Sequence, residues 1–369
     1  MTSSRTWGGN LKKEKDMKAI YPKSMRRIIP ALLLVAILSA CEQKNPVFPD
    51  FDYTAVYFPL QFPIRTLSLG EEPYDNSLDK ELKFHIAPNI GGMYENNQDW
   101  VVEYIVDESL AVNVQNVNGD TILALPSSYY TLTPANQVTI PSGSFKGLIE
   151  VQLTQQFLDD PLAYGNHYVI PLKIVGSTAD SILSGQISEA NPEPDPRVPG
   201  QWIVAPKDFV LFGIKYINDY HGTYLHRGID ITYDSLNNPI DTAIYRKNYV
   251  VDDELWDLTT RGRNVVHSNG ISINTGAVDG DYAMKLTFAE NGQIQVDSLA
   301  GSAYAVSGTG MHVEDGDRWG GEPRDAIYLS YEFSDGPNLH RVKDTLVYRN
   351  RGIKFEEFNP VVPEIPEVK

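Results

Sequence analysis

The sequence predicts an all-β protein with two domains, a β-sandwich followed by a closed antiparallel β-barrel. Its 369 residues leave room for about two domains at roughly 150 residues each. Short runs of β-branched and aromatic residues recur between clusters of Gly, Pro, Asn and Asp, a pattern typical of all-β folds. Hydrophobic residues make up 42% of the chain and charged residues 21%, so it can bury a core and is not wholly disordered.

The first 40 residues read as a signal peptide. A basic region precedes the uncharged apolar run 28–40, which ends in small residues. This run is shorter than the roughly 20 apolar residues that a membrane-spanning helix needs. Met17 or Met25 would give a more compact basic region than Met1, so part of this segment can be a gene-model extension. We therefore exclude residues 1–40 from the fold prediction.

The signal peptide ends in Leu38-Ser39-Ala40-Cys41, which resembles the bacterial lipobox. In that motif the chain is cut before the cysteine and the sulfur is acylated, so Cys41 is the predicted lipidation site. Each buried methylene of an acyl chain contributes about 0.8 kcal/mol, enough for several chains to hold a folded body at a membrane. Cys41 is the only cysteine, so no intrachain disulfide can form. Residues 42–50, with two prolines, are expected to be a tether.

Residues 51–217 are expected to form the sandwich. Between residues 81 and 86, apolar and polar side chains alternate as on a half-buried strand. Residues 154–160 resemble a helical turn that Pro161 ends. The strands predicted from the same signals are 54–58, 81–87, 101–106, 110–114, 129–132, 137–140, 148–154 and 167–175.

The proline-rich segment 191–200 is interpreted as a loop inside this first domain. Residues 208–217 follow it as an almost continuous apolar run, which is typical of a strand buried on both faces. We expect this run to pair with residues 167–175 and to close the sandwich, which places the domain boundary at about Asn218.

Residues 218–359 are expected to form the barrel. The first strand of this region alternates from Tyr224 to Tyr233, and Asn291-Gly292 is a strong hairpin signal. About eight antiparallel strands suit a closed barrel, which removes exposed edges and whose mouth can hold one small ligand. The tail 360–369 is predicted to be loose. Further strands are predicted at 243–250, 282–288, 293–297, 303–307, 326–333 and 341–348.

No familiar catalytic or metal-binding motif occurs, so we predict no catalytic residue, metal or cofactor. The seven histidines are scattered, and His221 and His226 would point to opposite faces of one strand. A pair of glycosidase carboxylates could still converge in three dimensions, because their separation cannot be read from a β-rich sequence. The net charge of −17 argues against nucleic acid as a partner.

The loop around Trp319 is the predicted ligand-binding site. An indole among glycines and charged residues suits stacking on a sugar ring, while the neighbouring Asp315, Asp317 and Arg318 could bond hydroxyl groups. The alternatives are a solvated acidic turn and an indole that folds back to plug the barrel end. Trp256, beside several acidic residues, is a second candidate for ligand binding.

Several short motifs resemble a family of Bacteroidota surface lipoproteins: KYINDYHGTY from Lys215, VTIPSG from Val138, YVIPL from Tyr168 and DTLVYR from Asp344. The resemblance implies an immunoglobulin-like N-terminal domain (domain of unknown function 1735 type) and a lipocalin-like C-terminal domain (domain of unknown function 4361 type). It also implies a polysaccharide-utilisation system at the outer membrane. The implied partners are a polysaccharide or oligosaccharide, a TonB-dependent transporter with its substrate-capturing lipoprotein, and the membrane through the anchor.

The expected function is therefore non-catalytic glycan binding at the cell surface. Two alternatives stay open. One is a glycoside hydrolase whose carboxylates converge only in the folded chain. The other is a structural or adhesive module that binds another protein.

Overall fold

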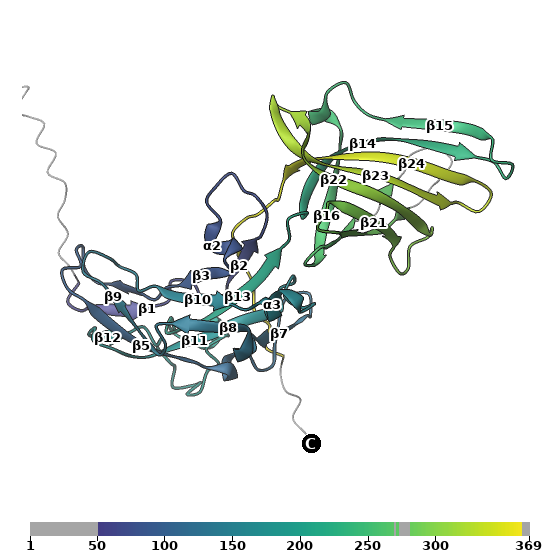
Figure 1. Cartoon of the computed structure of the whole chain (residues 1–369). Helices are drawn as coiled ribbons and strands as arrows, with labels where there is room; N and C mark the ends of the chain where they lie inside the picture. The colour runs from purple at the N-terminus through teal and green to yellow at the C-terminus, as the bar shows by residue number, and fades with distance from the viewer. Residues whose placement is uncertain (1–50, 269–270, 273–280, 364–369) are drawn as a thin grey trace, which may run out of the picture. The chain divides into compact units, whose positions relative to one another are not determined.

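The computed structural model describes residues 51–268, 271–272 and 281–363, and it confirms the all-β prediction (Figure 1). The predicted signal peptide, the tether and Cys41 lie outside the described residues. No helix in the described part of the chain combines the length and apolar character needed to cross a membrane.

The sandwich is built on one large sheet. Its strand order is β25-β2-β13-β11-β5-β9, and the short strands β6 and β7 lie beside β11. The bounds are β25 (Glu356–Glu357), β2 (Pro63–Ser68), β13 (Phe209–Ile217), β11 (Tyr168–Ser177), β5 (Trp100–Val106), β9 (Gln137–Ile140), β6 (Val114–Gln115) and β7 (Thr121–Ala124). β11 and β13 pair antiparallel from Tyr168↔Ile214 to Lys173↔Phe209, which confirms the predicted closing strand.

Two smaller sheets complete the sandwich. One has the order β3-β10-β8 and the other the order β12-β1-β4. Phe84 and Val151 from the first of these belong to the same buried cluster as Tyr104 and Ile170 of the large sheet, so the core lies between the sheets. The bounds are β3 (Lys83–Ile86), β10 (Ile149–Leu153), β8 (Tyr130–Thr133), β12 (Ser181–Ile182), β1 (Ala55–Tyr57) and β4 (Asn89–Gly91).

Short helices connect these strands. The predicted helical turn is α3 (Gln155–Asp159), and α2 (Ser77–Lys80) links β2 to β3. The predicted strand at residues 110–114 is wrong up to residue 113: η1 (Glu108–Ala111) and a turn precede β6, because the Asp107 carboxylate accepts a hydrogen bond from the Ser109 amide and caps a helical turn. Two further short helices, η2 (Ser127–Tyr129) and η3 (Pro199–Gln201), lie in loops of the sandwich.

The second body is a closed eight-stranded antiparallel barrel, as predicted. β14 and β24 close it by pairing from Thr223↔Asn350 to Tyr233↔Leu339. The barrel strands are β14 (Gly222–Tyr233), β16 (Glu254–Gly262), β17 (Val265–Ser268), β20 (Met284–Phe288), β21 (Gln293–Ser298), β22 (Val306–Trp319), β23 (Glu322–Ser334) and β24 (Leu339–Asn350). β15 (Pro239–Tyr245) adds to the second half of β14. η4 (Val250–Asp252) precedes β16, and β18 (Ile271–Ser272) pairs with β19 (Asp281–Tyr282).

The barrel interior is packed with apolar side chains. Every second residue of each wall strand faces inward, as Leu258, Leu286, Val296, Leu329 and Leu346 show, and all are buried. The predicted Asn291-Gly292 hairpin is confirmed between β20 and β21. Gly292 has φ 79°, the left-handed conformation that glycine adopts without a Cβ penalty.

The C-terminal segment corrects one predicted boundary. The barrel ends at Asn350 rather than at residue 359, and the chain then returns to the sandwich, where β25 pairs with β2. The reason is burial: Phe358 packs against Phe62 with ring centroids 5.5 Å apart. Val361 also exchanges backbone hydrogen bonds with Gln115, so residues 360–363 are attached rather than loose, and residues 364–369 lie outside the described residues.

Candidate ligand-binding site

The predicted site residues around Trp319 lie together on the β22–β23 hairpin. Trp319 is half-buried, and its Nε1 donates a hydrogen bond of 2.8 Å to the carbonyl oxygen of Tyr348 on β24. The Arg324 guanidinium lies 4.8 Å from the centre of the indole ring. The indole N–H and one part of the Trp319 ring surface therefore already contact residues of the barrel.

Two carboxylates of this hairpin accept hydrogen bonds from backbone amides of the same hairpin. The amide of Asp315 donates to the Asp325 carboxylate at 3.1 Å, and the amide of Arg318 donates to Asp317 at 2.7 Å. Asp315 and Arg318 are exposed. The structure thus brings the four predicted residues onto one hairpin, and ligand binding by them stays a prediction.

Trp256 lies elsewhere and does not offer an open face. It is 6% exposed and packs edge-on against His226 with ring centroids 4.5 Å apart. Trp256 shares the inward face of β16 with Leu258 and Thr260, because residues two apart on a strand point the same way. Its expected role in stacking on a ligand is therefore corrected to a role in the barrel core.

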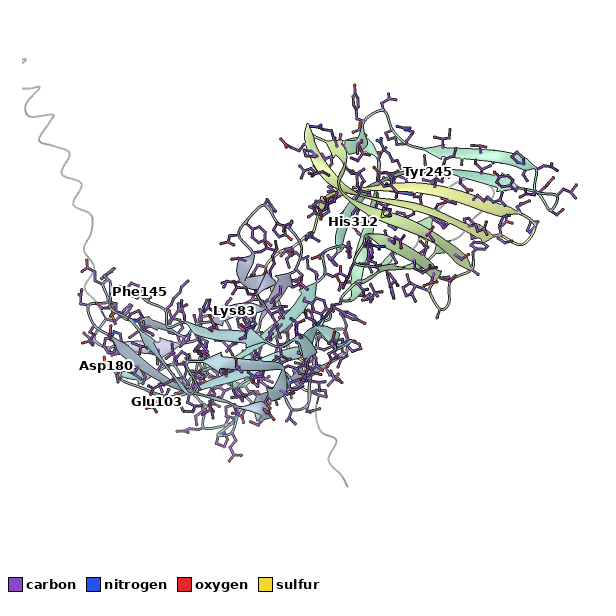
Figure 2. All side chains as sticks on the ribbon, in the orientation of Figure 1. Lys83, Glu103, Phe145, Asp180, Tyr245 and His312 are labelled. Atoms are coloured by element: carbon purple, nitrogen blue, oxygen red, sulfur yellow. The ribbon has the colours of Figure 1, made fainter. Side chains whose placement is uncertain are left out.

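A buried polar cluster stands beside Trp256. The Asp344 carboxylate, 2% exposed, accepts hydrogen bonds from the hydroxyls of Tyr331, at 2.7 Å, and Tyr245. His226 Nε2 lies 3.2 Å from the same carboxylate. Figure 2 labels Tyr245, which comes from β15 outside the barrel wall proper. Because the cluster is enclosed and the Asp344 carboxylate is the shared acceptor of two buried hydroxyls, we assign it to the stability of the barrel.

Two further histidines, His340, which is buried, and His221, which is half-buried, have opposite electrostatic surroundings. His340 Nδ1 lies 2.9 Å from Asp230, and its Nε2 lies 3.4 Å from Asp335. Burial alone would lower the pKa of His340, but hydrogen bonds and charge from Asp230 and Asp335 outweigh it and raise the pKa above the usual 6.5.

His221 behaves in the opposite way. Burial, followed by the positive charges of Arg351 and Lys215, lowers the pKa of His221 to about 4. Its Nδ1 accepts a hydrogen bond of 3.1 Å from the Thr260 amide, which requires the neutral ring.

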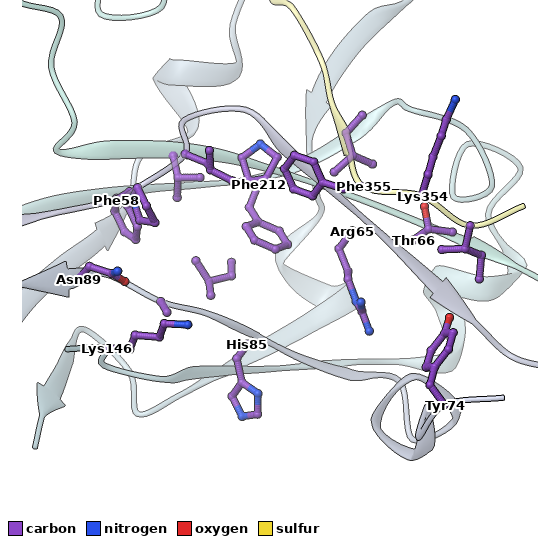
Figure 3. Close-up of a pocket in the computed structure, with 18 residues that line it drawn as sticks. Phe58, Arg65, Thr66, Tyr74, His85, Asn89, Lys146, Phe212, Lys354 and Phe355 are labelled. Atoms are coloured by element: carbon purple, nitrogen blue, oxygen red, sulfur yellow. The ribbon is translucent and has the colours of Figure 1, made fainter. Parts of the chain in front are cut away.

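A groove in the sandwich is an open site lined largely by apolar side chains. It has a volume of about 760 Å³, within the roughly 300–1,000 Å³ typical of small-molecule sites. We call it the inter-sheet groove (Figure 3). It is lined by β2 with residues 353–355 and by β3 with the residues that follow it, and the buried or half-buried Phe58, Val210 and Phe212 form its floor. Asn89 and Lys146 lie at one end and Tyr74 at the other.

Aromatic side chains line the inter-sheet groove from floor to rim. Phe212 is half-buried and stacks on Phe84 of the core, with centroids 5.4 Å apart and planes 15° from parallel. Tyr74 and Phe355 at the rim are 50% and 69% exposed. Burial of a Phe side chain stabilises a fold by about 1.5–3 kcal/mol, and Phe355 gains little of this. We therefore attribute the position of Phe355 on the rim of this apolar groove to ligand recognition rather than to fold stability.

Two polar atoms on the groove wall lack partners. Thr66 Oγ1 and Asn89 Oδ1 are both buried, and within the described residues neither makes a hydrogen bond. An unpaired buried polar group costs about 1–3 kcal/mol, so a ligand that satisfied these two atoms would recover part of that cost. Aromatic surface with a few convergent polar atoms can bind and orient a ligand.

Sequence reasoning missed this site. Phe355 carries the signal that pointed to Trp319, an aromatic residue in a charged, non-periodic segment. The segments that meet in the groove are far apart in sequence: 58–66, 74, 85–89, 146, 210–212 and 353–355. Among the described residues, no group of three His, Cys, Asp or Glu side chains could hold a metal ion.

Comparisons with known proteins identify both parts of the chain. Residues 219–352 match the family model for a domain of unknown function, DUF5627, rather than the 4361 type that the resemblance implies. Residues 51–181 match a family model described as an N-terminal domain. No curated protein is significantly similar to the chain.

Solved structures are also similar. One protein of unknown function from Bacteroides ovatus is 35% identical over 85% of this chain and 100% of its own, with a TM-score of 0.77. A multidomain Bacteroides ovatus protein that includes DUF1735 is 16% identical over 80% of this chain and 95% of its own. Its TM-score of 0.41 is too low to support any argument about this chain.

Proposed function

The chain belongs to the same family as the Bacteroides ovatus protein of unknown function, and we propose that it is a non-catalytic glycan-binding lipoprotein of the outer membrane, anchored at the cell surface through Cys41. The inter-sheet groove is the proposed binding site. The proposal includes a polysaccharide or oligosaccharide as ligand, and a TonB-dependent transporter with its substrate-capturing lipoprotein as partners. The barrel is proposed to be lipocalin-like and the sandwich immunoglobulin-like.

One observation carries this proposal: exposed aromatic rings stand beside unsatisfied polar atoms in one groove. Phe355 and Tyr74 can stack on the apolar C–H face of a sugar ring, and rotation of the Thr66 and Asn89 side chains would bring their unpaired oxygens to its hydroxyls. A sugar ring offers both an apolar face and polar edges, so it matches both features. A purely apolar ligand would leave the two polar atoms unpaired.

Affinity electrophoresis against a panel of polysaccharides tests the proposal. We expect the full chain to be retarded by at least one polysaccharide and Phe355→Ala to lose most of the retardation. Tyr249→Ala is the matched control, because Tyr249 is an aromatic residue 71% exposed on the barrel. Unchanged mobility of the wild-type protein in every gel would count against glycan binding.

The same preparation separates the alternatives. Loss of retardation in Trp319→Ala but not in Phe355→Ala would move the site to the β22–β23 hairpin. Steady release of reducing sugar would indicate a glycoside hydrolase. Co-purification of a protein partner without any affinity for glycans would favour a structural or adhesive module.

A further inference from the structure

We infer that the inter-sheet groove selects an anionic glycan, one that carries carboxylate or sulfate groups on its sugar rings; this inference rests on the proposed function. Arg65, Lys146, Lys354 and His85 line the groove, and the groove lining contains no Asp or Glu. The whole chain has a net charge of −17 and 48 acidic residues, so a groove lined only by basic and neutral residues departs sharply from the rest of the molecule.

Lys146 is the cation best placed to meet such a ligand. An isolated β-bridge pairs Lys146 with Asn89, which sets the lysine beside the unpartnered Asn89 Oδ1 at one end of the groove (Figure 3). Among the described residues, no carboxylate forms an ion pair with Lys146 or with Lys354 on the rim. Both ammonium groups are therefore available to pair with an anionic ligand.

Arg65 adds a cation held in a defined position. Its guanidinium forms an ion pair with the buried Asp79 carboxylate, which also accepts a hydrogen bond of 3.1 Å from the Ser68 amide. The Arg65 side chain is still 45% exposed, so some of its N–H groups remain available to a ligand. Asp79 offsets much of the charge of Arg65. We therefore expect the two lysines to contribute most of the electrostatic attraction to the ligand and Arg65 to orient it.

The two features of the groove together describe the ligand. Aromatic rings at floor and rim suit the apolar faces of sugar rings, and the cations suit anionic substituents that project from the same rings. A neutral glycan would leave the lysines without partners. The strongly negative charge of the rest of the chain disfavours non-specific adhesion of a polyanion, so any such binding must come from a local cationic site.

Matched pairs of polysaccharides test this inference by affinity electrophoresis of the full chain. The carboxylate arm compares polygalacturonate with its fully methyl-esterified form, and the sulfate arm compares dextran sulfate with dextran. The variants are Lys146→Gln, Lys354→Gln and Phe355→Ala, and Lys343→Gln on the exposed outer face of the barrel is the charge-matched control. The lysines are exposed, so thermal unfolding at the wild-type temperature verifies that each variant folds.

We expect the anionic member of at least one pair to bind at least tenfold more tightly than its neutral partner. Loss of one charge-assisted contact should weaken that binding about tenfold in Lys146→Gln and Lys354→Gln, with no change in Lys343→Gln. The arm that responds identifies carboxylate or sulfate as the anion.

Three results would overturn the inference. Equal binding of both members of each pair, lost only in Phe355→Ala, would keep the glycan-binding proposal and remove the anion preference. Equal weakening in Lys343→Gln and Lys146→Gln would show non-specific charge attraction. Failure of all four polysaccharides to bind, together with no retardation in the broader panel, would remove the proposed function as well.

Discussion

Replacement of Asp344 by alanine should strongly destabilise the barrel. In the native barrel this carboxylate is the acceptor for the hydroxyls of Tyr331 and Tyr245 and lies 3.2 Å from His226 Nε2. Gly228 is the register partner of Asp344 on β14, and without a side chain it leaves room for the carboxylate. The variant would leave several polar groups facing a buried site without their acceptor.

The expected loss is about 3–5 kcal/mol. Each buried hydroxyl that loses its acceptor costs about 1–3 kcal/mol, and removing one partner of a buried ionic cluster typically costs about 3–5 kcal/mol in total. Since domains are typically stable by only about 5–15 kcal/mol, such a loss is large. Tyr331→Phe removes a single donor and leaves the carboxylate with Tyr245 and His226, so its expected cost is smaller, about 1–2 kcal/mol.

Urea unfolding, followed by circular dichroism and by tryptophan fluorescence, measures these changes. The matched control is Asp297→Ala: its carboxylate lies 3.3 Å from Lys285 Nζ in a partly exposed pair, which should contribute less than about 1 kcal/mol. If Asp344→Ala unfolded at the same urea concentration as Asp297→Ala, the buried cluster would not stabilise the barrel and the reasoning would be refuted.

Three further predictions concern pH and the C-terminal segment. His221 has a folded-state pKa of about 4, below the unfolded value of about 6.5, so stability should fall as pH drops from 6.5 towards 4; a flat profile, or the same slope in His221→Gln, would contradict this. His340 has a raised folded-state pKa, so its contribution is complete below pH 6.5 and is lost as pH rises through that pKa. An NMR titration of the His340 ring should therefore show a midpoint above 6.5, and a midpoint below it would disprove the assignment. Phe358→Ala should cost about 3–5 kcal/mol in thermal or urea unfolding, because the ring is 7% exposed, packs edge-on against Phe62 and belongs to the same buried cluster as Phe209; a loss below 1 kcal/mol would mean that the return segment is only loosely attached.

Local patterns predicted much of the fold correctly. Alternation on β3 indicated a half-buried strand, and the apolar run at residues 208–217 indicated a strand buried on both faces. These predictions succeeded because the periodicity of a strand and its burial can be recognised from the types of neighbouring residues. The Asn291-Gly292 hairpin succeeded for a similar reason, since only the turn residues themselves need the unusual backbone conformation.

The candidate site was only partly accessible to the same reasoning. The four predicted residues around Trp319 lie on one hairpin, because they are consecutive or nearly so in the sequence. Trp256 was placed on the wrong side of the barrel wall, because the acidic residues around it suggested exposure while the register of β16 turns position 256 inward.

The all-β class, the buried strand at residues 208–217 and the count of about eight barrel strands could be predicted from the sequence alone. Each of these depends on periodicity and turn chemistry within a few residues. The return of residues 353–363 to the sandwich is visible only in the folded chain, as is the meeting of Phe355, Tyr74, Thr66, Asn89 and Lys146 in one groove. The physical reason is that strand pairing and burial act between segments far apart in the chain. Contacts between such segments depend on the register and packing of whole sheets, which no local pattern encodes.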